Sequence, residues 1–380
     1  MRSAEDELAE IDKSGLRRQL RILESPQSPV VMIDGREMIN FSSNDYLGIA
    51  NSSVLKKAFV EGIEKFGVGS GASRLISGTH APHRDFERGL AEFKRTEAAL
   101  FFGSGYATAT GAIPAVVGKN DIVILDKLCH ASLIDGAKLS GATMRIFPHN
   151  DLAKLESHLR WAHEQIGNGD GRILILTESV FSMDGDVAPL IEIVELKKEH
   201  DALLLVDEAH AFGVFGPDGR GYAAELGLDS DIDFQMGTLS KAAGLSGGYL
   251  CASKSWIDLI INRARSFIYS TAPPPALAAA ASASLKLIYS SDGDVLRDQL
   301  RANIRRFSEI AESAIIPKII GENDATLAVA KQLHDKGYLV PAIRFPTVPR
   351  GTARLRITLS ATHSAEQIES LKNELTGLIC

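Results

Sequence analysis

The sequence predicts an α/β fold, in which a mixed, mostly parallel sheet of seven strands precedes a smaller α+β domain. Short apolar runs alternate with helical periodicity between residues 98 and 252, which is the pattern of βαβ units. The chain between Leu239 and Gly248 is too short for the crossover that parallel neighbours require, so the last strand is predicted to be antiparallel. After about residue 285 this alternation stops, which indicates the smaller domain.

The N-terminal part is predicted to hold helices and one hairpin. Residues 4–24 form a charged amphipathic pattern, and Pro26 and Pro29 are expected to end that helix. Asp34-Gly35 lies between two apolar runs and predicts a tight hairpin turn. Helical spacing follows at 53–66 and again around Phe86, Leu90 and Phe93, on either side of the glycine-rich loop 67–74.

The seven strands are predicted from short, apolar, β-branched runs. They cover 98–103, 121–126, 144–148, 172–178, 202–207, 234–239 and 248–252. Helices are expected at 152–166, 190–200 and 255–266, and after the proline run that ends at 275.

The smaller domain is predicted from three further strands, 315–320, 339–344 and 353–359, around a helix at 324–336. A last helix begins at Ser364, where Gln367 completes a capping box. The expected domains are an N-terminal segment 1–45, a large domain 46–284 and a small domain 285–380.

Composition and charge exclude several classes of protein. The chain has 380 residues, 45% of them hydrophobic and 23% charged, with a formal net charge of −7 and no dense basic run. Binding to nucleic acid or to an anionic membrane is therefore not expected. The three cysteines form no C-x-x-C pair, and we expect neither a signal peptide nor a membrane span from the sequence, so a cytoplasmic location is predicted.

Lys241 stands at the end of the strand 234–239, among small residues and glycines. Such surroundings let a ligand approach closely, and they suit a lysine that forms a Schiff base with an aldehyde cofactor. In isolation, a Ser-Lys-Ala-Ala segment is more commonly an ordinary loop.

Asp207 ends a buried strand, at the edge where open α/β sheets bind their ligands. The run Asp207-Glu-Ala-His210 also matches a helicase box that binds magnesium. That interpretation needs a phosphate loop G-x-x-x-x-G-K-[ST], and Gly118-Lys119 does not provide one because Asn120 follows it.

Other motifs leave alternatives open. Gly103-Ser-Gly105 before a helix is either a phosphate-binding helix start or a plain turn. His80 and His83 have a metal-like spacing without a third ligand, so no metal is predicted. Arg354 and Arg356 share one face of a strand, and they either form a solvated edge or bind a substrate carboxylate. The serine in Gly244–Gly248 is not predicted to be a nucleophile, because a strand and not a helix follows it.

Six sequence motifs together resemble the α-oxoamine synthases, pyridoxal-phosphate (PLP) enzymes of the aspartate-aminotransferase-like fold (fold type I). They are Phe-Ser-Ser-Asn-Asp-Tyr-Leu-Gly (41–48), Gly-Ser-Gly-Ala-Ser-Arg (69–74), Cys-His-Ala-Ser (129–132), Phe-Ser-Met-Asp-Gly-Asp (181–186), Val-Asp-Glu-Ala-His (206–210) and Gly-Thr-Leu-Ser-Lys (237–241). The resemblance runs from about residue 16 to 378.

This resemblance implies a cofactor site. Lys241 would hold PLP and later act as general base, Asp207 would pair with the pyridine nitrogen, and His130 would stack on the ring. The other implied cofactor residues are Gly105, Tyr106, Ser182, His210 and Thr238, together with Thr271 across a homodimer interface that holds the active site. The implied substrate residues are Arg17 (or its neighbour Arg18), Asn44, Glu178, Thr347 and Arg356.

The resemblance also implies a reaction, the decarboxylative condensation of an amino acid with an acyl thioester. Residues 342–359 are most similar to the branch that joins L-alanine to a pimeloyl thioester, carried by CoA or a carrier protein, on the route to biotin. Sibling enzymes use glycine or serine with other acyl-CoA substrates. An aminotransferase and a non-enzymatic subunit of the same fold remain alternatives. One departure is the short link between the helix ending near Phe307 and Ser313.

Overall fold

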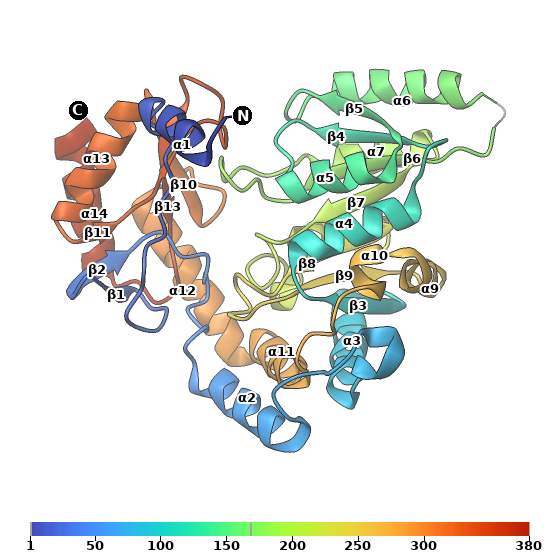
Figure 1. The fold of residues 1–380 in the computed structure, drawn as a ribbon, viewed down its shortest axis with the longest axis horizontal. Coiled ribbons are helices and arrows are strands. Elements are labelled where there is room, and N and C mark those ends of the chain that lie inside the picture. The colour runs from blue at the N-terminus through green and yellow to red at the C-terminus, as the bar shows by residue number, and fades with distance from the viewer. Residues whose placement is uncertain (1, 168, 380) are drawn as a thin grey trace. The chain divides into compact units, whose positions relative to one another are not determined.

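The computed structural model describes residues 2–167 and 169–379, which divide into two compact units (Figure 1). The central unit comprises residues 49–182 and 186–297. The terminal unit comprises the chain up to residue 48, residues 183–185, and the chain from 298 onward. The domain boundaries predicted after 45 and after 284 therefore differ from the positions where the compact units change over. Helix α12 (Ser291–Phe307) is one reason, because it contributes residues to both units.

The central unit contains the predicted seven-stranded sheet, in the order β3-β9-β8-β7-β6-β4-β5. Its strands are β3 (Ala98–Phe102), β4 (Ile122–Asp126), β5 (Thr143–Phe147), β6 (Ile173–Glu178), β7 (Leu203–Asp207), β8 (Phe234–Thr238) and β9 (Gly248–Ala252). All neighbours are parallel except β9, which is antiparallel to β3 and to β8. The predicted fold class, including the antiparallel last strand, is confirmed.

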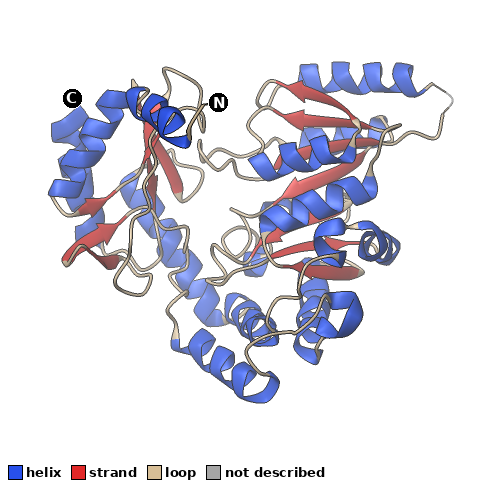
Figure 2. Ribbon diagram, viewed as in Figure 1, coloured by secondary structure: helices blue, strands red, loops and turns tan. Residues whose placement is uncertain are grey.

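Helices cover both faces of this sheet, and Figure 2 shows the strands in red between blue helices. The helices of the central unit are α2 (Ser53–Phe66), α3 (Ala81–Lys94), α4 (Gly105–Val116), α5 (Ala131–Ser140), α6 (Leu152–Ile166), α7 (Leu190–Glu199), α8 (Tyr222–Glu225), α9 (Lys254–Arg263), α10 (Arg265–Ile268) and α11 (Pro275–Ile288), with a short π-helix at Arg74–Gly78 and a 3-10 turn at Pro217–Gly219. Val123 packs in one buried cluster with residues of α4, α5 and α9, whereas Ile122 packs in another with α6 and α7. Since successive side chains of a strand point to opposite faces, a continuous apolar run such as β4 supplies both cores.

The terminal unit holds two three-stranded sheets, in the orders β1-β2-β11 and β10-β13-β12. Its strands are β1 (Val30–Ile33), β2 (Arg36–Asn40), β10 (Ile315–Gly321), β11 (Tyr338–Leu339), β12 (Ala342–Ile343) and β13 (Ala353–Thr358). Its helices are α1 (Ala4–Lys13), α13 (Asn323–Asp335), α14 (Ala365–Ile379) and the end of α12. The hairpin turn at Asp34-Gly35 is as predicted, since both residues have the positive φ that such turns require (50° and 68°). The capping box of Ser364 with Gln367 is also formed.

Two sequence predictions for the terminal unit are wrong. The first helix ends at Lys13 instead of residue 24, because Gly15 takes a φ of 64° and the N–H of Leu16 donates back to the carbonyl of Ile11. The strand predicted at 339–344 is two short strands in different sheets. Pro341 lies between them and has no N–H for a strand ladder.

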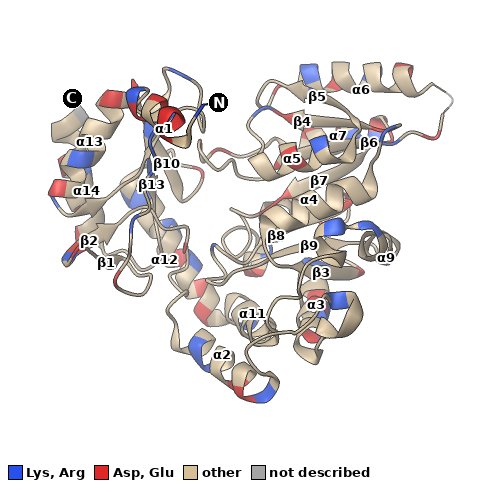
Figure 3. Cartoon of the chain, in the orientation of Figure 1, with Lys and Arg blue, Asp and Glu red and all other residues tan. Residues whose placement is uncertain are grey.

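Figure 3 shows charged residues, in blue and red, on the outer helices α2 and α6. In the described part of the chain, each helix is too short or too polar to cross a lipid bilayer.

Candidate active site

Polar residues gather at one edge of the central sheet, where the parallel strands β4, β6, β7 and β8 end. Their last residues are Asp126, Glu178, Asp207 and Thr238. The strand register places Glu178 beside Asp207, and Asp207 beside Met236. Strands β6 and β7 thus deliver two buried carboxyl groups to neighbouring positions at the edge where open α/β sheets bind ligands.

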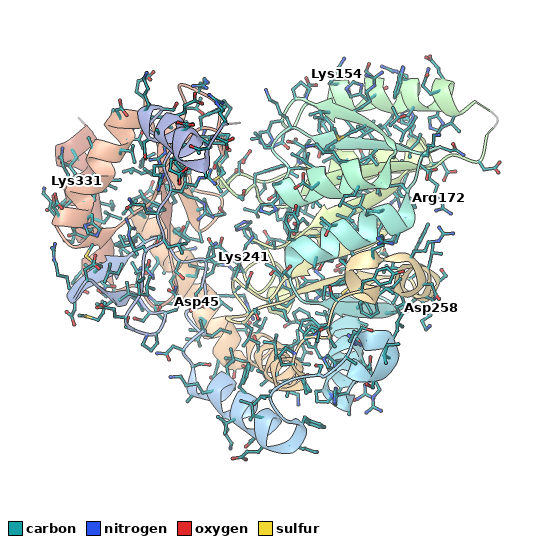
Figure 4. The ribbon with its side chains drawn as sticks, viewed as in Figure 1. Asp45, Lys154, Arg172, Lys241, Asp258 and Lys331 are labelled. Atoms are coloured by element: carbon teal, nitrogen blue, oxygen red, sulfur yellow. The ribbon has the colours of Figure 1, made fainter. Side chains whose placement is uncertain are left out.

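Lys241 lies in the tight link between β8 and β9, as predicted (Figure 4). Its Nζ is 2.6 Å from Nε2 of His210. The link is held by Thr238, whose hydroxyl donates to the carbonyl of Gly247 at 2.7 Å. Gly247 has a φ of 119°, and a Cβ there would lie 2.5 Å from the ring of Phe101, so this turn requires glycine.

Asp207 is buried, and its Oδ1 accepts a hydrogen bond from the N–H of Ala209 at 2.9 Å. Burial raises the pKa of Asp207, and the positive charge of Lys241 opposes that increase. A carboxylate in such a place is stabilised by a cation, and Lys241 is the first one that the structure offers.

Glu178 and His130 form a second pair at this edge. The N–H of His130 donates to Oε1 of Glu178 at 2.5 Å. Burial raises the pKa of Glu178 to about 8, and the charge of Asp207 adds to the effect. Burial lowers the pKa of His130, whose Nδ1 also lies 2.8 Å from the hydroxyl of Ser132 at the start of α5. At neutral pH the two side chains are therefore mostly uncharged.

A cavity of about 230 Å³ opens between these groups. It is lined by Ser104, Gly105, Tyr106, His130, Ser132, Glu178, Asp207, Ala209, His210, Met236, Gly237, Thr238, Ser240 and Lys241. The structure thus brings together seven of the nine predicted cofactor residues. Ser182 and Thr271 do not line the cavity. Ser182 is buried, whereas Thr271 is exposed and pairs with Ser73.

The N-terminus of α4 faces this cavity through Gly105 and Tyr106. Ser104 caps the helix by accepting a hydrogen bond from the N–H of Ala107 at 3.0 Å. A Cβ on Gly248 would lie 2.5 Å from the nitrogen of Gly105, so glycine in β9 is what allows the helix to begin so close to the sheet. A helix N-terminus in this position can bind an anionic group.

A larger cavity of about 660 Å³ lies elsewhere in the central unit, between α3 and α11. It shares no lining residue with the polar edge. The smaller cavity is the candidate active site, because it alone of the two collects buried groups with shifted pKa values around a lysine.

The predicted substrate residues fall in both units. Glu178 lies in the central unit, and the other four lie in the terminal unit. There the guanidinium of Arg356 donates to Oδ1 of Asn44 at 3.1 Å. Both Arg354 and Arg356 are buried, at 4% and 5% exposed, so the alternative of a solvated edge is wrong.

Arg17 and Thr347 are exposed, and both contact Arg344, a residue that the sequence did not single out. The guanidinium of Arg344 donates to the carbonyl of Arg17 at 2.8 Å, and its own carbonyl accepts from the N–H of Thr347 at 3.0 Å. The choice between Arg17 and Arg18 stays a prediction.

Two further polar clusters of the central unit were missed by sequence reasoning. One is the ion pair of Lys94 with Glu208, both fully buried. The other joins His149 to Asp126 and Asp186. The available signal for the second was that Asp126 and His149 each stand at or near the end of a predicted strand, as Asp207 does.

Comparison with known proteins decides the family. Residues 36–375 match the family of class I and II aminotransferases. The chain belongs to this family. It is 47% identical over 378 residues to an 8-amino-7-oxononanoate synthase of Geobacter sulfurreducens, an alignment that covers 97% of this chain and 95% of that protein.

Solved structures agree with this family. A serine palmitoyltransferase from S. paucimobilis, determined with PLP and myriocin bound, has a TM-score of 0.90 at 31% identity, covering 98% of this chain and 95% of that one. An 8-amino-7-oxononanoate synthase from Francisella tularensis has a TM-score of 0.76 at 29% identity, covering 90% and 97%. The predictions of an enzyme, and of a member of the α-oxoamine synthases with the aminotransferase-like fold, are confirmed.

Proposed function

We propose that this chain is a PLP-dependent 8-amino-7-oxononanoate synthase, which condenses L-alanine with a pimeloyl thioester and releases CO2 and a free thiol. The observation that carries the proposal is the cavity at the strand edge, where Lys241, Asp207 and His130 meet in a chain 47% identical to an enzyme of that name. The reaction belongs to biotin biosynthesis, and we place it in the cytoplasm.

The lining of the cavity fits PLP at three points. An amine is needed for the aldehyde, and Lys241 supplies it from a glycine-rich link. A buried anion is needed for the protonated ring nitrogen, and Asp207 supplies it from the neighbouring strand. A helix N-terminus suits the phosphate, and α4 begins at the cavity with Gly105. His130 and His210 would contact the ring, while Tyr106, Ser182 and Thr238 would complete the cofactor site.

When bound, PLP supplies an electron sink for negative charge at the Cα of the amino acid. Lys241 would first hold the cofactor and then, as a free amine, remove the Cα proton and later return one. The 2.6 Å contact with Nε2 of His210 supports this role, because a ring nitrogen that accepts from the lysine keeps the amine directed into the cavity.

Asp207 would keep the ring nitrogen protonated. Burial raises the pKa of Asp207 because it destabilises the charged carboxylate. A nearby positive charge therefore stabilises this carboxylate more than it would stabilise an exposed carboxylate. Glu178, with a pKa of about 8, keeps its proton at neutral pH and can donate a hydrogen bond to an oxygen of the substrate.

The substrate residues are assigned by chemistry. Arg356, oriented by Asn44, would bind the carboxylate of alanine. Arg17 and Thr347 would contact the acyl thioester, and Arg344 links these two positions. Thr271, exposed beside Ser73, would reach the cofactor phosphate of a second copy in a homodimer. The large domain 46–284 would thus bind the cofactor, and the small domain 285–380 with the N-terminal segment would bind substrate.

Serine palmitoyltransferase is the second candidate, because its backbone superimposes with the higher TM-score. The sequence identity favours the first candidate, since side chains select the substrate whereas a TM-score compares backbone paths.

An assay of thiol release by the cofactor-loaded protein separates these functions. Purified protein should bind PLP, and borohydride should fix the cofactor to Lys241 in a peptide map. Thiol release should then require both L-alanine and a pimeloyl thioester, on CoA or a carrier protein. Release with serine and palmitoyl-CoA, or with glycine and acetyl-CoA, would assign the chain to a sibling enzyme. Amino transfer to a keto acid without thiol release would make it an aminotransferase.

A further inference from the structure

A charged cluster of the central unit lies outside the cavity. His149 follows β5, with Nδ1 3.0 Å from Oδ1 of Asp126 and Nε2 2.7 Å from Oδ2 of Asp186. Its ring packs perpendicular to that of Phe181, with centroids 4.3 Å apart and planes at 86°. Each ring nitrogen faces a carboxylate oxygen, so both nitrogens act as donors and the ring is an imidazolium.

The charge of this ring is stable across neutral pH. Burial alone would lower the pKa of His149, but the hydrogen bonds to Asp126 and Asp186, together with their charges, outweigh burial and raise the pKa to about 10. Hydrogen bonds between an imidazolium and carboxylates are roughly twice as strong as neutral ones.

Asp126 connects the imidazolium to the segment that leads to His130. Its Oδ1 also accepts the N–H of Leu128 at 2.7 Å, and its backbone carbonyl accepts the N–H of Cys129 at 3.2 Å. Asp126 thus holds two of the three residues that separate β4 from His130, Leu128 through the carboxylate that binds His149 and Cys129 through its backbone carbonyl.

Asp186 connects the imidazolium to the hairpin 179–188, which follows Glu178 and carries Ser182. The hairpin is closed by the bridge of Val180 with Val187 and by the N–H of Phe181, which donates to the carbonyl of Asp186 at 3.0 Å. Asn150, next to His149, donates its side-chain amide to the carbonyl of Val187 at 3.2 Å. His149 and Asn150 therefore hold the hairpin at two points, the side chain of Asp186 and the backbone carbonyl of Val187.

We propose that His149 is a positioning residue for the cofactor site, in which one imidazolium ties the segment before His130 to the hairpin that carries Ser182. The inference rests on the proposed function, since both of those residues are assigned there to PLP. Asp126, His149 and Asp186 do not line the cavity, so they act through the two segments that they hold and not on the cofactor itself. With this connection in place, the segment before His130 and the hairpin that carries Ser182 keep a fixed separation.

Three variants test the tie. His149→Phe keeps a ring against Phe181 but removes both donors, and Asp186→Asn keeps the shape of the partially exposed carboxylate while removing its charge. His163→Phe is the matched control, because that histidine is exposed on α6 and hydrogen-bonds to the carbonyl of His200. We expect the Kd for PLP to rise about tenfold in His149→Phe, and by less in Asp186→Asn. The control should stay within twofold of the parent.

The double variant shows whether the residues act as one unit. Once His149 is gone, the charge of Asp186 has no imidazolium to bind, so His149→Phe/Asp186→Asn should bind PLP no more weakly than His149→Phe alone. Additive losses would show that the two side chains act separately and would overturn the tie. An unchanged Kd in His149→Phe would overturn it as well.

Amide hydrogen exchange of the protein without cofactor gives a second readout. Residues 127–133 and 179–188 should exchange faster in His149→Phe, and peptides of α9 should not change. Uniformly faster exchange would indicate general destabilisation and contradict the proposal; if His149→Phe does not fold, exchange of both segments in Asp186→Asn decides. A parent protein that fails to bind PLP would overturn the proposed function, while the exchange result still tests the tie.

Discussion

Asp207 and Glu208 are neighbours in the chain, but their carboxyl groups have different surroundings. Glu208 is fully buried, pairs with the equally buried Lys94 and accepts the N–H of Ala223 at 2.9 Å. Asp207 is buried too, but it lines a cavity, and the one hydrogen bond to its side chain noted above comes from Ala209. The first carboxylate has its counter-charge within the fold. The second shares a cavity with Lys241, and a ligand in that cavity can supply a further positive charge, which distinguishes a binding site from a structural ion pair.

The largest effect should come from the amine that faces Asp207. Lys241→Ala removes both the covalent attachment of PLP and the proposed base, so thiol release should fall by at least ~10⁴-fold. Borohydride should then leave no cofactor on the protein. If residual activity of a tenth or more persisted, another base would have to be assigned.

Replacing the carboxylates of Asp207 and Glu208 by amides should separate an effect on catalysis from an effect on stability. Asp207→Asn should reduce kcat by about 10²-fold or more, because the positive charge on the cofactor loses its buried partner. Its thermal midpoint should stay close to that of the parent. Glu208→Gln should do the reverse, with a lower midpoint and nearly unchanged kcat in the folded fraction. Equal effects of both variants on kcat would remove the distinction drawn above.

Removing Lys94 from its buried ion pair with Glu208 should destabilise the protein. Lys94→Met leaves Glu208 charged and buried without its partner, which is expected to lower the free energy of unfolding by about 3–5 kcal/mol. Urea unfolding measures this difference. Adding Glu208→Gln in the same chain should recover part of the loss, since the uncompensated charge is then gone. A double variant as unstable as Lys94→Met alone would contradict the explanation.

The last prediction concerns the pH dependence of stability and Glu178, whose pKa in the folded protein is raised to about 8 from an ordinary 4.5. Between these values the unfolded chain has released the proton while the folded protein still holds it, so stability falls as pH rises from about 4.5 to 8. Glu178→Gln cannot titrate and should show a flatter dependence. Thermal midpoints of both proteins at pH 5 and pH 8 measure the difference. Parallel curves would mean that Glu178 is ionised throughout.

The strands and the polar residues at their ends could be predicted because both signals are local. Buried parallel strands such as β7 are unbroken apolar runs. The position of Asp207 at the end of β7 could be predicted because the apolar run stops there. The motif resemblance then grouped Lys241, Asp207 and His130, which the structure places around one cavity. Their roles in catalysis stay predictions until the variants are measured.

Contacts between distant parts of the chain could not be predicted in this way. The partner of Lys94 lies 114 residues away, and those of His149 lie 23 and 37 residues away. The hydrophobic periodicity of the sequence does not predict such pairs, because they depend on which strands become neighbours in the sheet. The wrong end of the first helix has a local cause, since the left-handed turn at Gly15 stops the helix before the amphipathic pattern ends.

The terminal unit has a consequence for how the chain folds during synthesis. Its strand β2 pairs with β11, so Ile39 lies opposite Tyr338. A ribosome would make the N-terminal hairpin roughly 15–60 seconds before the strand that completes its sheet. Throughout that interval the hairpin lacks the third strand that gives such structures independent stability. The early hairpin is therefore a natural substrate for a chaperone that binds nascent chains.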